Sequence, residues 1–119
     1  MVTINHIHNG FRNKEQIVEE IAKAWETLDA DLIIQNLDES FVYDSQWVFE
    51  SLDYAGYKEY IRGKFQTLKN KEVGPYVKIV PDNFEGGTMI ALQQGNNEPC
   101  FFRIKVLNGK VIKGDLCAF

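Results

Sequence analysis

Residues 41–50 read FVYDSQWVFE, a run of aromatic and β-branched residues with three polar side chains in its middle, Asp44, Ser45 and Gln46. Val, Tyr, Phe and Trp favour strands, so the run predicts β-structure over 40–52. A kink at Ser45-Gln46 would divide it into two short strands. The polar residues have two interpretations: they line the rim of a mostly apolar cavity, or they only form a turn between the strands.

Helical patterns lie on both sides of this run. Apolar residues recur at helical spacing from Ile17 to Leu28, and Asn13 followed by Gln16 has the form of a capping box. A break at 28–30 separates this helix from a second, short one at 31–37. After the run, Gly56 begins a third helix with Tyr57, Ile61, Phe65 and Leu68 on one face, and Gly74-Pro75 ends it.

The rest of the chain predicts four strands, because turn residues separate four β-rich segments at 76–80, 88–94, 100–106 and 110–119. The predicted order over 13–119 is therefore α-α-β-β-α-β-β-β-β, after an irregular lead-in at 1–12. A chain of 119 residues has room for one domain. We expect an α+β domain with the helices on one face of an antiparallel sheet.

The last hairpin has two candidate registers around Asn108-Gly109. A two-residue turn pairs Leu107 with Lys110 and mixes charge into the apolar face of the sheet. A three-residue loop with Gly109 at positive φ pairs Val106 with Lys110, and it gathers Cys100, Phe102 and Ile104 opposite Leu116, Gly114 and Ile112. Since a slip of one residue exchanges the two faces, we predict the three-residue loop. It leaves Cys100 and Cys117 on opposite faces, unable to form a disulfide.

Composition excludes several classes of protein. The net charge is -4, which argues against nucleic acid or an anionic membrane as the main partner. No apolar run reaches the roughly 18 residues of a membrane span. The N-terminal MVTINHIHNG lacks the basic and apolar regions of a signal peptide. With two cysteines and no disulfide framework, we expect a cytoplasmic protein with free thiols.

The chain resembles the nuclear transport factor 2-like superfamily, in its ketosteroid-isomerase-like and SnoaL-like branch. The resemblance covers about 13–119 and rests on four segments: Trp25 with 28–31, the stretch 41–47, Gly56, and 109–112. It implies a cone-shaped, strongly curved antiparallel sheet around a pocket that the helices close. It also implies a homodimer through the outer face of the sheet, where we expect Phe101, Val111 and Cys117.

The catalytic residues of the isomerase members do not carry over to this sequence. Their aspartate base aligns with Ser45, or with Asp44 if the alignment slips by one residue. Their second acid aligns near Phe102, and their tyrosine near Ala22, neither of which can donate a hydrogen bond from its side chain. Steroid-isomerase chemistry is therefore not expected.

Three hypotheses for the function remain open. The leading one is a cavity that binds a small, largely apolar molecule through Trp25, Tyr43, Ser45, Trp47, Phe102, Ile104, Gly114 and Leu116. The second is an isomerase, cyclase or dehydratase-like enzyme in which Asp44, desolvated in the cone, has a raised pKa and acts as general acid or base. The third is a protein-interaction module whose cone is filled by its aromatic side chains.

We expect neither a metal nor another cofactor. His6 and His8 lie on one side of an extended segment, but the sequence nearby supplies no further ligands. The thiol of Cys100 has no cationic neighbour in sequence, and we expect it to be a small core residue.

Overall fold

The computed structural model describes residues 12–47, 50–72 and 74–118. The predicted order of elements is confirmed, and His6, His8 and the lead-in at 1–11 lie outside the described residues. The helices are α1 (Lys14–Thr27), α2 (Ala30–Ile34) and α3 (Tyr54–Asn70), and the strands are β1 (Leu37–Ser45), β2 (Leu52–Asp53), β3 (Tyr76–Pro81), β4 (Thr88–Gln93), β5 (Cys100–Leu107) and β6 (Lys110–Cys117).

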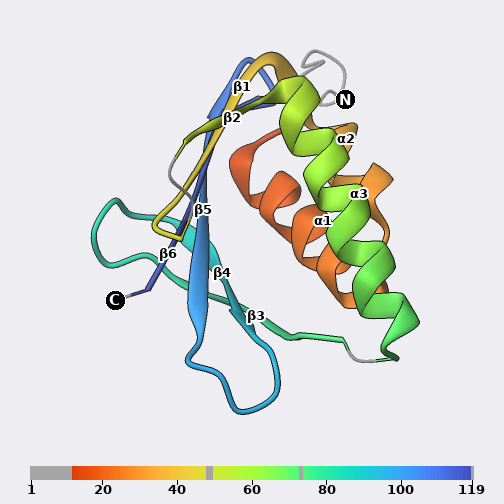
Figure 1. Ribbon diagram of the computed structural model, residues 1–119. Coiled ribbons are helices and arrows are strands. Elements are labelled where there is room, and N and C mark those ends of the chain that lie inside the picture. Colours follow the sequence, from red (N-terminus) through yellow and green to blue (C-terminus); the bar gives the residue numbers. More distant parts are fainter. Residues whose placement is uncertain (1–11, 48–49, 73, 119) are drawn as a thin grey trace, which may run out of the picture.

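The strands form one curved, open sheet in the order β2-β1-β6-β5-β4-β3, and the helices lie against one of its faces (Figure 1). The prediction of a wholly antiparallel sheet is wrong in one place, because β1 and β6 pair in parallel. The hairpins β3–β4 and β5–β6 must be antiparallel because short turns join their strands. The β1–β6 pair joins distant segments of the chain, so no tight turn sets its direction.

Local signals place the helix ends. Asn13 and Gln16 form the predicted capping box, with Asn13 Oδ1 accepting from the Gln16 backbone N at 2.8 Å. The third helix begins at Tyr54, two residues before the predicted start, because the Asp53 side chain caps it by accepting from Gly56 N at 2.8 Å. It ends at Asn70, before Gly74-Pro75. The second helix is shorter than predicted, since Leu37 already begins β1.

The β5–β6 hairpin follows neither candidate register over its whole length, so the predicted three-residue loop is wrong. Leu107 pairs with Lys110 across a two-residue turn in which Asn108 and Gly109 have φ of 53° and 77°. A bulge then follows, so that Ile104 pairs with Gly114 and not with Ile112. The extra residue exchanges the two faces of the strand beyond it. The two-residue turn therefore does not bring charged side chains into the apolar face, which was the reason for predicting the three-residue loop.

The bulge also changes the face of Val111. This residue was expected on the outer face, but it is fully buried in the core next to Leu37. Beyond the bulge, Gly114 is buried, and a Cβ there would meet the core residues Phe102 and Phe41. Phe101 pairs with Cys117, so Cys100 and Cys117 are not directly opposite, and both cysteines are free.

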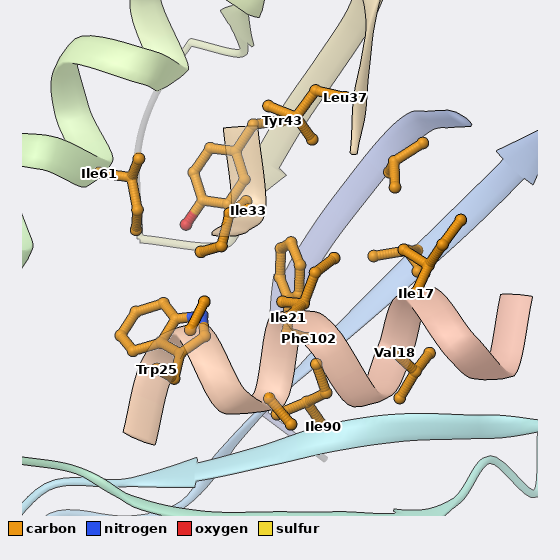
Figure 2. Close-up of a cluster of buried hydrophobic side chains, with 14 of the residues drawn as sticks. Ile17, Val18, Ile21, Trp25, Ile33, Leu37, Tyr43, Ile61, Ile90 and Phe102 are labelled. Carbon is orange, nitrogen blue, oxygen red and sulfur yellow. The ribbon is translucent and has the colours of Figure 1, made fainter. Parts of the chain in front are cut away.

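The core fills the space between the helices and the sheet (Figure 2). Ile17, Val18 and Ile21 of α1 belong to this cluster together with Phe41 of β1 and Phe102 of β5, and all five have almost no exposed surface. No helix within the described ranges is long and apolar enough to cross a membrane.

Candidate functional site

A pocket of about 340 Å³ lies between α1, the middle of α3 and the sheet, where the β4–β5 loop and the segment after β1 border it. This volume lies in the range of small-molecule sites, roughly 300–1,000 Å³. Three residues predicted to bind a ligand line it: Trp25, Trp47 and Leu116. The lining residues that the sequence did not indicate are Tyr60, Lys64, Pro75, Leu92, Gln94, Asn97, Glu98 and Cys100.

Regular elements hold most of this lining. Tyr60 and Lys64 lie one turn apart on α3, so both side chains project from the same side of the helix. Leu92 and Cys100 are cross-strand partners on β4 and β5, which places both side chains on the same face of the sheet. The apolar wall of the pocket is therefore an extension of the core.

The segment at 45–47 forms part of the pocket rim. The Ser45 hydroxyl accepts from the Trp47 backbone N at 3.2 Å, and the Gln46 backbone N donates to Leu116 O at 3.2 Å. These bonds end β1 and leave Trp47 at the pocket with 56% of its surface exposed. Ser45 and Gln46 thus form the turn that ends β1, and that turn carries Trp47, one of the lining aromatic side chains.

Trp25 lies deep in the pocket wall and is only 5% exposed. Its ring packs edge-on against Phe65, with 4.8 Å between the ring centroids and 77° between the planes. Within the described part of the chain, Trp25 Nε1 is the one buried side-chain nitrogen or oxygen without a hydrogen-bond partner. Leaving such a donor unsatisfied costs about 1–3 kcal/mol.

Three tyrosines pack together beside the pocket. The ring centroid of Tyr43 lies 4.7 Å from that of Tyr57 and 5.8 Å from that of Tyr60. Burial raises the pKa of all three phenols, and most strongly that of the fully buried Tyr57. They therefore stay neutral near pH 7, where they can donate a hydrogen bond but cannot serve as phenolate bases.

Cys100 is half-buried in the pocket wall and not a pure core residue. Burial raises the pKa of its thiol, and the nearby Lys64 ammonium opposes that effect only in part. The protonated thiol that results is a poor nucleophile. Cys100 thus contributes shape and apolar surface to the pocket.

Asp44 lies on the outer face of the sheet, on the opposite side of β1 from the buried Tyr43, and it does not line the pocket. Its side chain is 38% exposed and pairs with Lys113 Nζ at 2.9 Å. The Ser51 hydroxyl donates to Asp44 Oδ1. The Ser51 hydrogen bond, followed by that of Lys113, lowers the pKa of this carboxyl. The prediction of a desolvated Asp44 with a raised pKa is wrong, because strand alternation turns it away from the cone.

The other predicted ligand-binding residues surround the pocket without lining it. Tyr43, Phe102 and Ile104 are buried in the core, where Tyr43 contacts the lining residue Tyr60. Gly114 lies beneath the rings of Phe102 and Phe41. Among the residues that the structure describes, no group of His, Cys, Asp and Glu could hold a metal ion.

The lining residues that sequence analysis missed come mainly from α3 and the β4–β5 loop. Tyr60 and Lys64 lie beside the apolar face of α3, so their spacing was the one available signal. The loop residues had no such signal in the sequence, because hydrogen bonds of the folded loop set their position. Asn97 N donates to Gln94 O at 3.0 Å, and Gln93 Nε2 donates to Asn97 O at 3.1 Å.

Comparison with solved structures places the fold. A SnoaL-like protein of unknown function from Burkholderia thailandensis matches with a TM-score of 0.67 at 15% identity, over 88% of this chain and 94% of that one. A nuclear transport factor 2-like protein of unknown function from Cytophaga hutchinsonii matches with a TM-score of 0.64 at 11% identity, over 91% of each chain.

An epoxide hydrolase from M. tuberculosis, of the LEH-like type, matches with a TM-score of 0.58 at 19% identity, over 85% of this chain and 78% of that one. No protein-family model and no curated protein matches the sequence. At these identities the likeness establishes the fold and not a function, because one fold can carry many functions.

Proposed function

We propose that this chain, whose fold is that of the nuclear transport factor 2-like superfamily, binds a small, largely apolar molecule in the pocket beside Trp25. The observation that carries the proposal is a pocket of about 340 Å³ that the core leaves unfilled. Phe41, Phe65 and Phe102 are packed within the core, whereas Trp25 and Trp47 line the pocket. The interaction-module hypothesis expected core side chains to fill the cone and the exposed face of the sheet to bind a partner protein, and the pocket counts against it.

We propose binding without catalysis, and the side chains that line the pocket support this. Next to the apolar wall lie the Tyr60 phenol and the Cys100 thiol, whose raised pKa values keep both neutral. The carboxylate of the lining, Glu98, is an exposed residue of the β4–β5 loop. A general base must reach the proton that it removes, and Asp44 lies outside the pocket. No observation favours the enzymatic alternative through Asp44.

The test uses the neutral fluorescent probe N-phenyl-1-naphthylamine. Both tryptophans of the chain line the pocket, so energy transfer from tryptophan to the bound probe reports binding, and two variants test whether the pocket is the site. Cys100→Phe adds a ring to the pocket wall, and Leu107→Phe adds one at an exposed position on the same strand. We expect the first variant to weaken binding about tenfold or more, a loss of about 1.4 kcal/mol, and the second to leave it unchanged. Equal binding by both variants and wild type would refute a pocket site.

We also propose that the chain forms a homodimer through the outer face of the sheet. Val42 is exposed there, and Phe101 and Cys117 are half-buried as a cross-strand pair. Light scattering at tens of micromolar should give the mass of a dimer for the wild type and of a monomer for Val42→Glu. A monomeric wild type would contradict this proposal.

The expectation of a cytoplasmic location, based on the two free cysteines, stays a prediction.

A further inference from the structure

Two hollows of the molecule meet at the middle of α3. The pocket described above and a wider groove of about 730 Å³ share three lining residues: Tyr60, Lys64 and Gln94. The groove follows one face of α3 from Gly56 to Leu68. The three shared residues therefore form the boundary between the pocket, with its apolar wall, and the groove. The polar end of a ligand whose body fills the pocket would lie at this boundary.

The boundary carries a charge that is partly withdrawn from water. Four charged residues line the two hollows in the described part of the chain: Glu59, Lys64, Lys71 and Glu98. Lys64 is half-buried, whereas the other three are exposed. Charges interact more strongly where the surrounding dielectric constant is lower. Lys64 therefore has more influence on the charge of a bound molecule than the exposed residues have.

The charge of Lys64 acts on the pocket wall and has no counter-ion. Lys64 on α3 and Cys100 on β5 both line the pocket, and the ammonium group opposes the rise in pKa that burial causes in the Cys100 thiol. Within the described ranges, no ion pair or hydrogen bond holds this ammonium group. By comparison, Lys113 is also half-buried and pairs with Asp44 at 2.9 Å. An anion at Lys64 would supply the missing partner.

We propose that the ligand of this pocket is an amphipathic carboxylic acid, with its apolar body in the pocket and its carboxylate at the ammonium group of Lys64. The inference rests on the proposed function and adds the charge of the ligand. One cation suits a carboxylate better than a phosphate monoester, whose charge near -2 would remain half unpaired beside Glu98. Lys64 is in this view the specificity-determining residue.

Two probes of the same shape test the charge separately from apolar binding. 2-Naphthoate carries an ionised carboxylate at pH 7, and in 2-naphthamide a neutral amide group takes its place. Binding is measured by NMR titration of the protein labelled with ¹⁵N, whose spectrum also shows whether each variant is folded. We expect 2-naphthoate to bind about tenfold more tightly at low ionic strength, because charge-assisted hydrogen bonds are stronger than neutral ones.

Two variants assign the preference to one residue. Lys64→Met keeps an unbranched apolar stem but has no charge, so it should reduce the preference for 2-naphthoate to about one. Lys69→Met removes the same charge from an exposed position on α3 that lines neither the pocket nor the groove. It should leave the preference at about tenfold. Lys64→Gln takes the place of Lys64→Met if the latter does not fold.

The outcomes separate the two proposals. Equal affinity of the wild type for both probes would overturn the acid while the apolar pocket stands. A preference that survives in Lys64→Met, or that Lys69→Met abolishes as well, would overturn the assignment to Lys64. No binding of either probe would overturn both proposals. Tighter binding of 2-naphthyl phosphate than of 2-naphthoate, lost in Lys64→Met, would replace the carboxylate by a phosphate and refute the inference as stated.

Discussion

Gly114→Ala should destabilise the protein even though the change adds one methyl group. A Cβ at this position would lie 2.8 Å from Phe102 Cζ, 3.0 Å from Phe102 Cε1 and 3.2 Å from Phe41 Cζ. Both rings are almost fully buried, so neither can move without disturbing its neighbours. Overpacking of this kind costs typically 1–3 kcal/mol.

A cost of about 2 kcal/mol corresponds to a fall in Tm of about 8 °C for a chain of this size. It lowers the urea midpoint by about 1 M if m is about 2 kcal/mol/M. The assay is urea unfolding followed by tryptophan fluorescence at pH 7. In a strand without such contacts, Gly→Ala would raise stability, so the sign of the change is itself diagnostic.

Gly63→Ala is the matched control, because Gly63 lies within α3 and a Cβ there meets no atom within 4 Å. That variant should gain about 0.5–1 kcal/mol from helix propensity. Phe102→Leu shortens the obstructing ring, so in the Gly114→Ala background it should cost less than it does in the wild type. A rise in the midpoint for Gly114→Ala, or strict additivity with Phe102→Leu, would refute the packing argument.

Two further predictions concern carboxylates. Hydrogen bonding to Arg12, first among several causes, lowers the pKa of Glu20 from 4.5 to about 2. The ionised carboxylate therefore stabilises the fold fully above about pH 4.5, and this contribution is lost as the pH falls toward 2. Glu20→Gln should lower the urea midpoint at pH 7 and converge with the wild type near pH 2, and a gap independent of pH would contradict the assignment. Asp44→Asn should leave binding of N-phenyl-1-naphthylamine unchanged between pH 5 and 8, since the ion pair with Lys113 lies outside the pocket; altered affinity would return Asp44 to the site.

Local patterns predicted the order of elements and many of their boundaries. The capping box at Asn13, the turn at Asn108-Gly109 and the apolar spacing of α1 and α3 are each set by neighbours within a few residues. Trp25, Trp47 and Leu116 were predicted to bind a ligand, and the structure places them around one pocket. Trp25 follows from helical periodicity and Trp47 from the resemblance to a known fold, whereas Leu116 was placed on the inner face by a hairpin register that the structure overturns.

Local sequence patterns were thus sufficient to predict an α+β chain with three helices and a last hairpin around Gly109. Three features became clear from the folded chain alone: the parallel pairing of β1 with β6, the bulge that buries Val111, and the side of β1 that carries Asp44. Each of these depends on contacts between segments far apart in the chain. Turn chemistry is local, but the face that a strand buries is chosen by whatever packs against it, and one extra residue in a bulge exchanges the two faces.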